Sequence, residues 1–217
     1  MAADPLALRS GAVAAAIRDW RLIAVLRRIE PRDRLIAIVD ELVADGIGVF
    51  EITFDGADAA LDLAAVRARV GEAAWVGAGT LRTTDQLHAA IDAGAAFGVS
   101  PVLDHAVLDA ALAAGLPFVP GAYTPTEADA AWRAGATFVK LFPGSSLGPS
   151  HVRELRGPLP ELETIVTGGV DASSAATFLE AGAVAVGIGS ALARMSREER
   201  RSLVASVGAP ATTEVRR

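Results

Sequence analysis

The sequence of 217 residues contains no cysteine and a single lysine. The absence of cysteine excludes disulfides, thiolate zinc sites and a cysteine nucleophile. The formal net charge is −6 and no basic cluster is present, which argues against a nucleic-acid partner. No apolar run reaches the length of a membrane span, and the apolar run near the N-terminus is too short for a signal peptide. We therefore expect a cytoplasmic protein that binds neither membranes nor nucleic acids.

The single lysine, Lys140, lies in an otherwise apolar run, residues 137–142, whereas the other basic residues are all arginines. Lysine can lose its proton and act as a nucleophile, whereas a guanidinium group stays protonated. A chain that keeps one lysine within an apolar run is typical of an enzyme that forms a Schiff base. The alternative is a lysine at a strand end whose head group reaches solvent.

Glycines recur every 20–25 residues, and a short apolar run follows each of them. They are Gly46, Gly71, Gly94, Gly115, Gly135, Gly157 and Gly182. A further apolar run at 22–26 makes eight runs, and helical patterns such as 34–44 precede most of the glycines. Strands that alternate with helices indicate βαβ units, and continuous apolar strands favour a parallel sheet covered on both faces.

This spacing predicts an α/β fold that is a single parallel (β/α)8 TIM barrel. We expect one domain over residues 1–217, with the barrel core at about 22–192 and an extra N-terminal helix across the barrel floor. An open, doubly wound sheet is the alternative fold.

The catalytic groups of such barrels sit where strands lead into the following loops. Glu51 is the only acid within an apolar strand run, where a carboxylate is costly unless it is paired or functional. A partly buried glutamate suits the proton transfers of Schiff-base chemistry. The alternative is an ion pair with Arg27 or Lys140, which would still place Glu51 beside the amine.

Glycine-rich segments follow the last two strands, at residues 167–169 and 187–190. Backbone N–H groups of glycine loops can approach an anion, and helix N-termini add partial positive charge. Because these two loops are the usual phosphate site of the fold, we expect a phosphate to bind there. The three histidines show no ligand spacing, so we predict no metal site.

Seven motifs, in this order, resemble those of the bacterial 2-keto-3-deoxy-6-phosphogluconate and 4-hydroxy-2-oxoglutarate aldolases, which are class I, Schiff-base enzymes. They are FEIT at 50–53, VGAGT at 76–80, VSP at 99–101, VPG at 119–121 with TPTE at 124–127, VKLFP at 139–143, TGG at 167–169 and GS at 189–190. The resemblance covers about residues 22–192.

The resemblance implies that Lys140 is the Schiff-base lysine and Glu51 the acid/base. The substrate-binding residues that it implies are Arg27, Thr80, Pro101, Phe142, Thr167, Gly168, Gly169, Gly189 and Ser190. It further implies cleavage of a 2-keto-3-deoxy-6-phospho sugar acid to pyruvate and glyceraldehyde 3-phosphate, without a cofactor, by a homotrimer.

One position departs from the family pattern. Several gluconate-type members carry an arginine that binds the substrate carboxylate four residues after the glutamate, where this chain has Asp55, which is expected to repel an anion. The related 2-keto-3-deoxy-6-phosphogalactonate aldolases carry an arginine at the end of the first strand, and Arg27 matches it. Two alternatives remain: a sugar-phosphate epimerase or isomerase barrel, and a non-catalytic phosphosugar-binding protein.

Overall fold

The structure, a computed structural model, describes residues 5–189 and 191–208. Within these residues, nine parallel strands form one sheet in the order β5-β4-β3-β2-β1-β9-β8-β7-β6. The strands are β1 (Leu22–Leu26), β2 (Val49–Thr53), β3 (Trp75–Gly79), β4 (Gly98–Val99), β5 (Phe118–Val119), β6 (Gly121–Ala122), β7 (Val139–Leu141), β8 (Thr164–Thr167) and β9 (Ala185–Ile188). The predicted parallel barrel is confirmed, and the open sheet is excluded.

The difference between the eight predicted strands and the nine observed arises at Pro120. Proline has no N–H to donate to a neighbouring strand, so the predicted fifth strand divides into β5 and β6 on either side of it. The carbonyl of Pro120 still accepts a hydrogen bond of 2.9 Å from the Lys140 N–H. Because β5 and β6 stand at opposite ends of the strand order yet adjoin along the chain, the sheet closes into a barrel.

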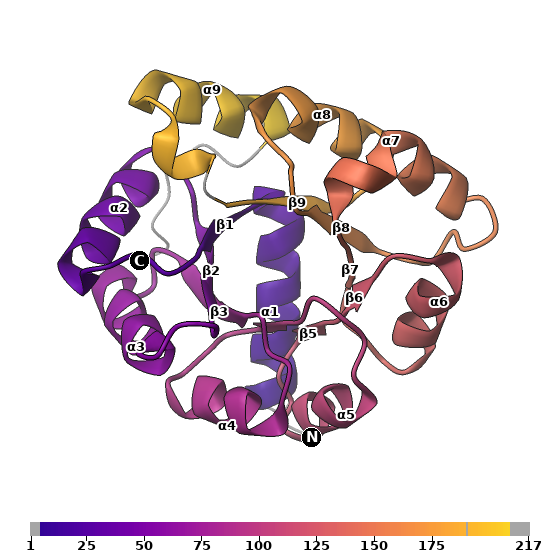
Figure 1. Cartoon of the computed structure of the whole chain (residues 1–217), viewed down its shortest axis with the longest axis horizontal. Helices are drawn as coiled ribbons and strands as arrows, with labels where there is room; N and C mark the ends of the chain where they lie inside the picture. The colour runs from indigo at the N-terminus through magenta and orange to yellow at the C-terminus, as the bar shows by residue number, and fades with distance from the viewer. Residues whose placement is uncertain (1–4, 190, 209–217) are drawn as a thin grey trace.

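Helices surround the sheet, and Figure 1 shows them as a ring around the barrel axis. They are α2 (Arg32–Ala44), α3 (Ala59–Val70), α4 (Thr84–Asp92), α5 (His105–Ala113), α6 (Pro125–Arg133), α7 (Gly144–Leu155), α8 (Ala172–Glu180) and α9 (Arg197–Val207), with a short 3-10 helix η1 (Leu192–Arg194) before α9. Six of the seven predicted glycines have positive φ, as expected after a helix, and Gly157 does not.

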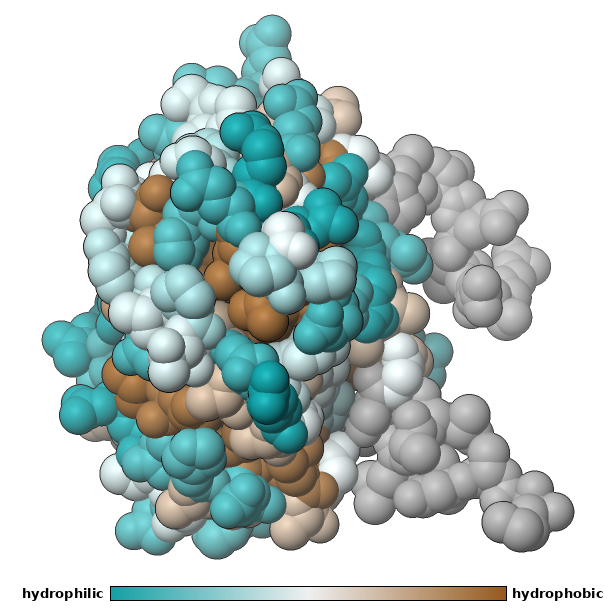
Figure 2. All heavy atoms as spheres, turned by 90° about the vertical axis from the view of Figure 1, so that its right-hand side faces the viewer, coloured by the Kyte–Doolittle hydropathy of each residue, from teal (hydrophilic) through white to brown (hydrophobic). Residues whose placement is uncertain are grey.

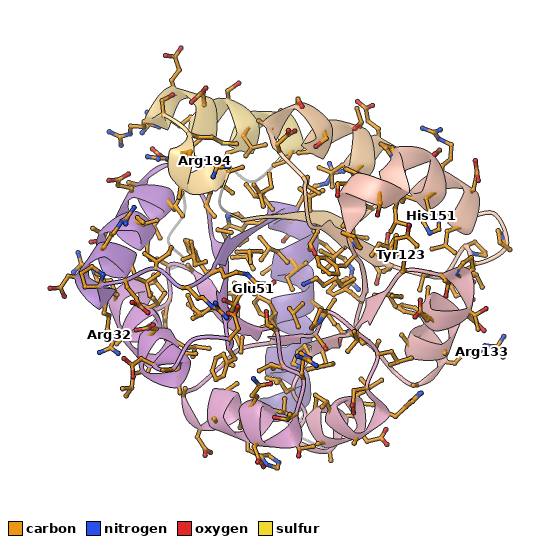
Figure 3. The ribbon with its side chains drawn as sticks, viewed as in Figure 1. Arg32, Glu51, Tyr123, Arg133, His151 and Arg194 are labelled. Carbon is orange, nitrogen blue, oxygen red and sulfur yellow. The ribbon has the colours of Figure 1, made fainter. Side chains whose placement is uncertain are left out.

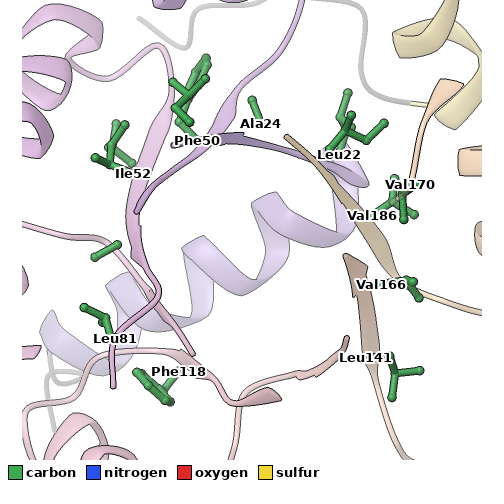
Figure 4. Close-up of a cluster of buried hydrophobic side chains, with 14 of the residues drawn as sticks. Leu22, Ala24, Phe50, Ile52, Leu81, Phe118, Leu141, Val166, Val170 and Val186 are labelled. Atoms are coloured by element: carbon green, nitrogen blue, oxygen red, sulfur yellow. The ribbon is translucent and has the colours of Figure 1, made fainter. Parts of the chain in front are cut away.

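Side chains alternate along each strand between the helices and the barrel interior. Phe50 and Ile52 point outward into the larger apolar cluster, where they pack with residues of α2 and α3 (Figure 4). Val49 belongs to a separate cluster inside the barrel. Glu51 lies two residues after Val49, and Lys140 lies two residues after the interior Phe138. Because side chains alternate along a strand, both functional candidates point inward.

The predicted N-terminal helix is α1 (Pro5–Trp20), which crosses the barrel behind the strands in Figure 1. Val13 and Ile17 are buried against the interior residues Phe138 and Ile165. The floor of the barrel is therefore closed by apolar packing, and the opposite end, where the strands finish, is left for the site.

Candidate active site

Lys140 occupies the middle of β7, paired in register with Gly121 on β6 and Ile165 on β8. Only 5% of the residue is exposed, so its head group does not lie in solvent. The ammonium nitrogen lies 5.3 Å from the centroid of the Phe142 ring. Among the residues that the structure describes, Lys140 has no ion-pair partner, which leaves its nitrogen open to chemistry.

A cavity of about 570 Å³ opens over Lys140 at the carboxyl ends of the strands. Seven predicted site residues line it: Arg27, Lys140, Phe142, Thr167, Gly168, Gly169 and Gly189. The cavity thus brings together the predicted nucleophile, the predicted anion-binding arginine and both glycine segments. Ser190, which was also predicted, lies outside the described residues.

Glu51 lies on β2 between Val25 of β1 and Gly77 of β3, and it points toward the barrel centre (Figure 3). The residue is 1% exposed, and its Oε1 has no hydrogen-bond partner. Its carboxylate packs against Gly79, where any Cβ would collide with it. No ion pair of Glu51 occurs within the described part of the chain, so the proposed pairing with Arg27 or Lys140 is not found.

Arg27 pairs with Asp55 instead. Its Nη1 donates to Asp55 Oδ2 at 2.7 Å, and its Nη2 donates to Thr80 Oγ1 at 3.2 Å. Arg28 contacts the same Asp55 oxygen at 3.2 Å. Burial disfavours the ionised form of Asp55, but a hydrogen bond with Thr53 and the charges of Arg27 and Arg28 outweigh burial and lower its pKa. Asp55 therefore contacts the predicted anion-binding arginine directly, a partnership that the sequence analysis missed.

Thr80 and Pro101, which were also predicted to bind the substrate, do not line this cavity. Thr80 reaches the site through its hydrogen bond with Arg27. The backbone of Pro101 packs so closely against Gly121 that a Cβ there would collide with it. Because Gly121 pairs with Lys140, Pro101 lies one strand away from the amine.

The first glycine segment has the backbone that was expected of an anion site. Gly168 and Gly169 have φ of +86° and +77°, values that side chains other than glycine rarely adopt. A Cβ on Gly168 would lie 2.8 Å from the Phe142 ring, and one on Gly169 would lie 2.5 Å from Ser145. Both positions therefore require glycine for conformation and for space.

Asp171 occupies the N-terminus of α8, and its carboxylate accepts hydrogen bonds from the N–H groups of Ser173 and Ser174. Bonds from both serines lower the pKa of Asp171. Because a carboxylate already neutralises this helix terminus, α8 is a poor anion site, which departs from the sequence-based expectation. A positively charged side chain that lines the cavity on this side is Arg194, an exposed residue of η1 that sequence reasoning missed.

The described residues contain no group of three or more His, Asp or Glu side chains placed to hold a metal ion. None of their helices is long and apolar enough to cross a membrane.

A closed parallel barrel with an inward lysine and carboxylate and a glycine-lined cavity at the strand ends defines a TIM-barrel enzyme with a lysine-centred site. Comparison with known proteins then identifies the enzyme family. The chain matches the KDPG and KHG aldolase family over residues 13–206 and belongs to that family. It is therefore an aldolase, a lyase that cleaves a carbon–carbon bond.

Individual relatives agree with this assignment. A probable 2-dehydro-3-deoxy-6-phosphogalactonate aldolase of Rhizobium meliloti is 36% identical over 79% of this chain and 81% of its own. A solved structure of native KDPGal has a TM-score of 0.77 and 32% identity over 86% of this chain and 91% of its own. A designed cube-shaped cage, made by fusing symmetric oligomeric domains, has the same TM-score and identity over 87% of this chain and 70% of its own.

Proposed function

We propose that this aldolase works through a Schiff base on Lys140 and that its substrate is a 2-keto-3-deoxy-6-phospho sugar acid. The observation that carries the proposal is the placement of the chain's single lysine. Lys140 is buried, has no ion-pair partner among the described residues, and shares one cavity with Arg27 and the glycine segments. An amine there meets the keto group of a substrate whose two anionic ends face opposite sides of the cavity.

The reaction begins when the neutral Lys140 nitrogen attacks the C2 keto carbon. The carbinolamine loses water to give an iminium ion, which accepts electrons. The C3–C4 bond then breaks: its electron pair flows toward the iminium nitrogen, and the C4 hydroxyl loses its proton as it becomes an aldehyde. Protonation of the resulting enamine at C3, followed by hydrolysis, releases pyruvate and restores the amine.

Glu51 is the group that we propose to move these protons. Glu51 has an unpartnered oxygen that is buried inside the barrel. The residue pairs in register with Val25 of β1, and Val25 lines the cavity together with Lys140. The carboxylate packs closely against the backbone of Gly79, which leaves no room there for a side chain. A fixed acid/base group near a reacting centre typically contributes about 10²- to 10⁴-fold to the rate.

The phosphate of the substrate would lie against Gly168, Gly169 and Gly189. Because Asp171 neutralises the end of α8, the balancing positive charge would come from Arg194. In the described part of the chain Arg194 has no ion-pair partner, so its guanidinium remains free to bind a phosphate in a bidentate manner.

The observations favour an aldolase over the two alternatives. An epimerase or isomerase of this fold would need two opposed acid/base groups at the cavity. With Glu51 as one such group, the second would have to be Asp171, the only carboxylate among the described residues that line the cavity, and that carboxylate already binds Ser173 and Ser174. A protein that only binds phosphosugars would not need a buried amine or a buried carboxylate.

Within the family, we expect the galactonate epimer to be accepted at least as well as the gluconate epimer. Arg27 stands where the galactonate branch carries its arginine, and it faces the same cavity as Lys140. The two relatives above that are named for the galactonate enzyme also match this chain over most of their length.

We also infer a cytoplasmic homotrimer. Among the described residues, three large exposed apolar side chains outside the cavity lie on α5 or just after β4 and β6: Val102, Leu112 and Tyr123. Figure 2, which views the molecule from the side of α6, shows apolar patches among hydrophilic ones. Light scattering should give about three times the chain mass of 22.2 kDa.

A direct assay tests the proposed function. Each 6-phosphate epimer is supplied, and pyruvate release is followed with a coupled lactate dehydrogenase. We expect turnover by the wild type and none by Lys140→Arg, which keeps the charge but removes the nucleophile. Turnover by a folded Lys140→Arg variant would contradict the proposal.

A further inference from the structure

Three charged side chains, Arg27, Arg28 and Asp55, form a cluster at the ends of β1 and β2. Arg27 and Arg28 both contact one oxygen of Asp55, at 2.7 Å and 3.2 Å. The cluster has a net charge of +1, because two guanidinium groups surround one carboxylate. A single arginine paired with Asp55 would be neutral, so Arg28 preserves the attraction for an anion.

The contacts of Arg27 fix the plane of its guanidinium group. One nitrogen binds Asp55, which follows β2, and the other binds Thr80, which follows β3, while Arg27 itself follows β1. The Arg27 side chain is 52% exposed, so without these contacts it would sample many rotamers. Ordering a free arginine costs side-chain entropy, and a guanidinium that is already oriented avoids most of that cost on binding.

Two residues of this region have backbones in the left-handed region although neither is glycine. Arg28 has φ of +48° and Thr80 has φ of +61°. Such backbones are costly, most of all for a β-branched residue, and persist where the surroundings hold them. Thr80 directly follows Gly79, against which the Glu51 carboxylate packs. The same short segment therefore places the hydroxyl that binds Arg27 and the backbone that confines Glu51.

From these contacts we infer that Asp55 is a positioning residue, which holds Arg27 in the orientation that binds the substrate carboxylate, while Arg28 offsets the charge of Asp55. The inference rests on the proposed function, since it assigns Arg27 to the carboxylate of the pyruvyl group. It reverses the expectation that Asp55 repels the substrate. Asp55 acts through Arg27 and makes no contact with the substrate itself.

The test is a double-mutant cycle on pyruvate binding. The four proteins are the wild type, Asp55→Ala, Arg27→Ala and the double variant. Each is titrated with pyruvate, the imine is trapped with borohydride, and the adduct is measured by intact-protein mass spectrometry. We expect Asp55→Ala to raise the half-saturating pyruvate concentration about tenfold, the size of one charged hydrogen bond. The yield of adduct at saturation should stay unchanged. In the Arg27→Ala background the same substitution should have no further effect, because coupled residues are not additive.

Two further variants keep the test decisive. Asp55→Asn preserves shape and hydrogen bonding, so it should fold and show a smaller rise. Asp40→Ala removes the partner of Arg69 from an exposed ion pair away from the mouth, and it should bind pyruvate as the wild type does.

Three outcomes separate the possible failures. Unchanged or tighter pyruvate binding by both Asp55 variants would overturn the inference. An equal loss with and without Arg27 would also overturn it, because Asp55 would then act independently. The absence of any pyruvyl adduct on the wild type would instead remove the proposed function itself.

Discussion

The two sides of the barrel mouth are built from different groups. On the side of β1 to β3, the site consists of charged side chains that neighbouring residues hold in place: Glu51 against Gly79, and Arg27 between Asp55 and Thr80. On the side of β8 and β9, the described residues that line the cavity include glycine backbone and the exposed Arg194. Lys140 lies on β7, next to β8, and shares one cavity with residues of both sides.

This difference matches the two tasks of the proposed reaction. Proton transfer and carboxylate binding need groups at fixed positions, so that side uses burial and ion pairs. Phosphate binding needs several N–H donors and access, so that side uses glycines and an exposed cation. Substitutions on the first side should affect pyruvate and the sugar acid alike, whereas substitutions on the second should affect only phosphorylated substrates.

The largest effect on the first side is expected at Glu51. Glu51→Gln keeps the size of the side chain but cannot move protons, so kcat should fall by about 10²- to 10⁴-fold. The matched control is Glu180→Gln, at an exposed residue of α8, which should retain full activity. Wild-type rates from Glu51→Gln would reduce Glu51 to a structural carboxylate.

The next largest effect on the first side is expected at Arg27. Arg27→Ala should raise KM about 10- to 100-fold for the sugar acid and weaken pyruvate binding by a similar factor, because it removes hydrogen bonds to a charged group. Arg27→Lys should recover part of the loss, since a point charge replaces a fork. An unchanged KM would mean that another group binds the carboxylate.

The opposite side is tested at Arg194. Arg194→Ala should raise KM about tenfold for a 6-phosphorylated substrate and leave pyruvate binding and cleavage of the unphosphorylated sugar acid unchanged. Arg153→Ala, at an exposed arginine of α7, is the control and should change neither. Equal losses on phosphorylated and unphosphorylated substrates would show that the two sides are not separate.

A residue far from the mouth should affect stability without affecting catalysis. Asp45 has a side chain that is 1% exposed and binds Arg197 and Arg200 of α9. Burial disfavours its charge, but the hydrogen bonds from Arg200 and Arg197 outweigh burial and lower its pKa. Its stabilising effect is therefore present above the unfolded pKa of about 3.9 and is lost as pH falls through the lower, folded value.

Asp45→Asn should accordingly lower Tm by about 5 °C or more at pH 7, since it weakens a buried ion pair. The difference from wild type should shrink below about pH 4, as Asp45 of the wild type becomes protonated. Thermal unfolding followed by circular dichroism at several pH values measures both. A Tm difference that does not change with pH would contradict this assignment.

Much of the fold was predictable because apolar runs and glycines repeat with the period of a βα unit. The strand at 22–26 was predicted to the residue. The division at Pro120 was not predicted, because proline in an apolar run signals a break without showing that the chain continues in the same sheet.

The site likewise contains residues that the sequence predicts and residues that it does not. Lys140 and Glu51 were predictable because each is out of place in an apolar run. The roles of Asp55 and Arg194 were not, because they depend on contacts between loops that only the folded barrel brings together. A charged residue in a loop looks the same in the sequence whether or not it has a partner.

Trapping of the imine tests whether the single lysine is the nucleophile. The wild type is incubated with pyruvate, reduced with borohydride, digested, and analysed by mass spectrometry. We expect one reduced pyruvyl group per chain, located on Lys140. Because the sequence has no other lysine, the competing amine is the N-terminus. An unmodified Lys140 at saturating pyruvate would contradict the Schiff-base mechanism.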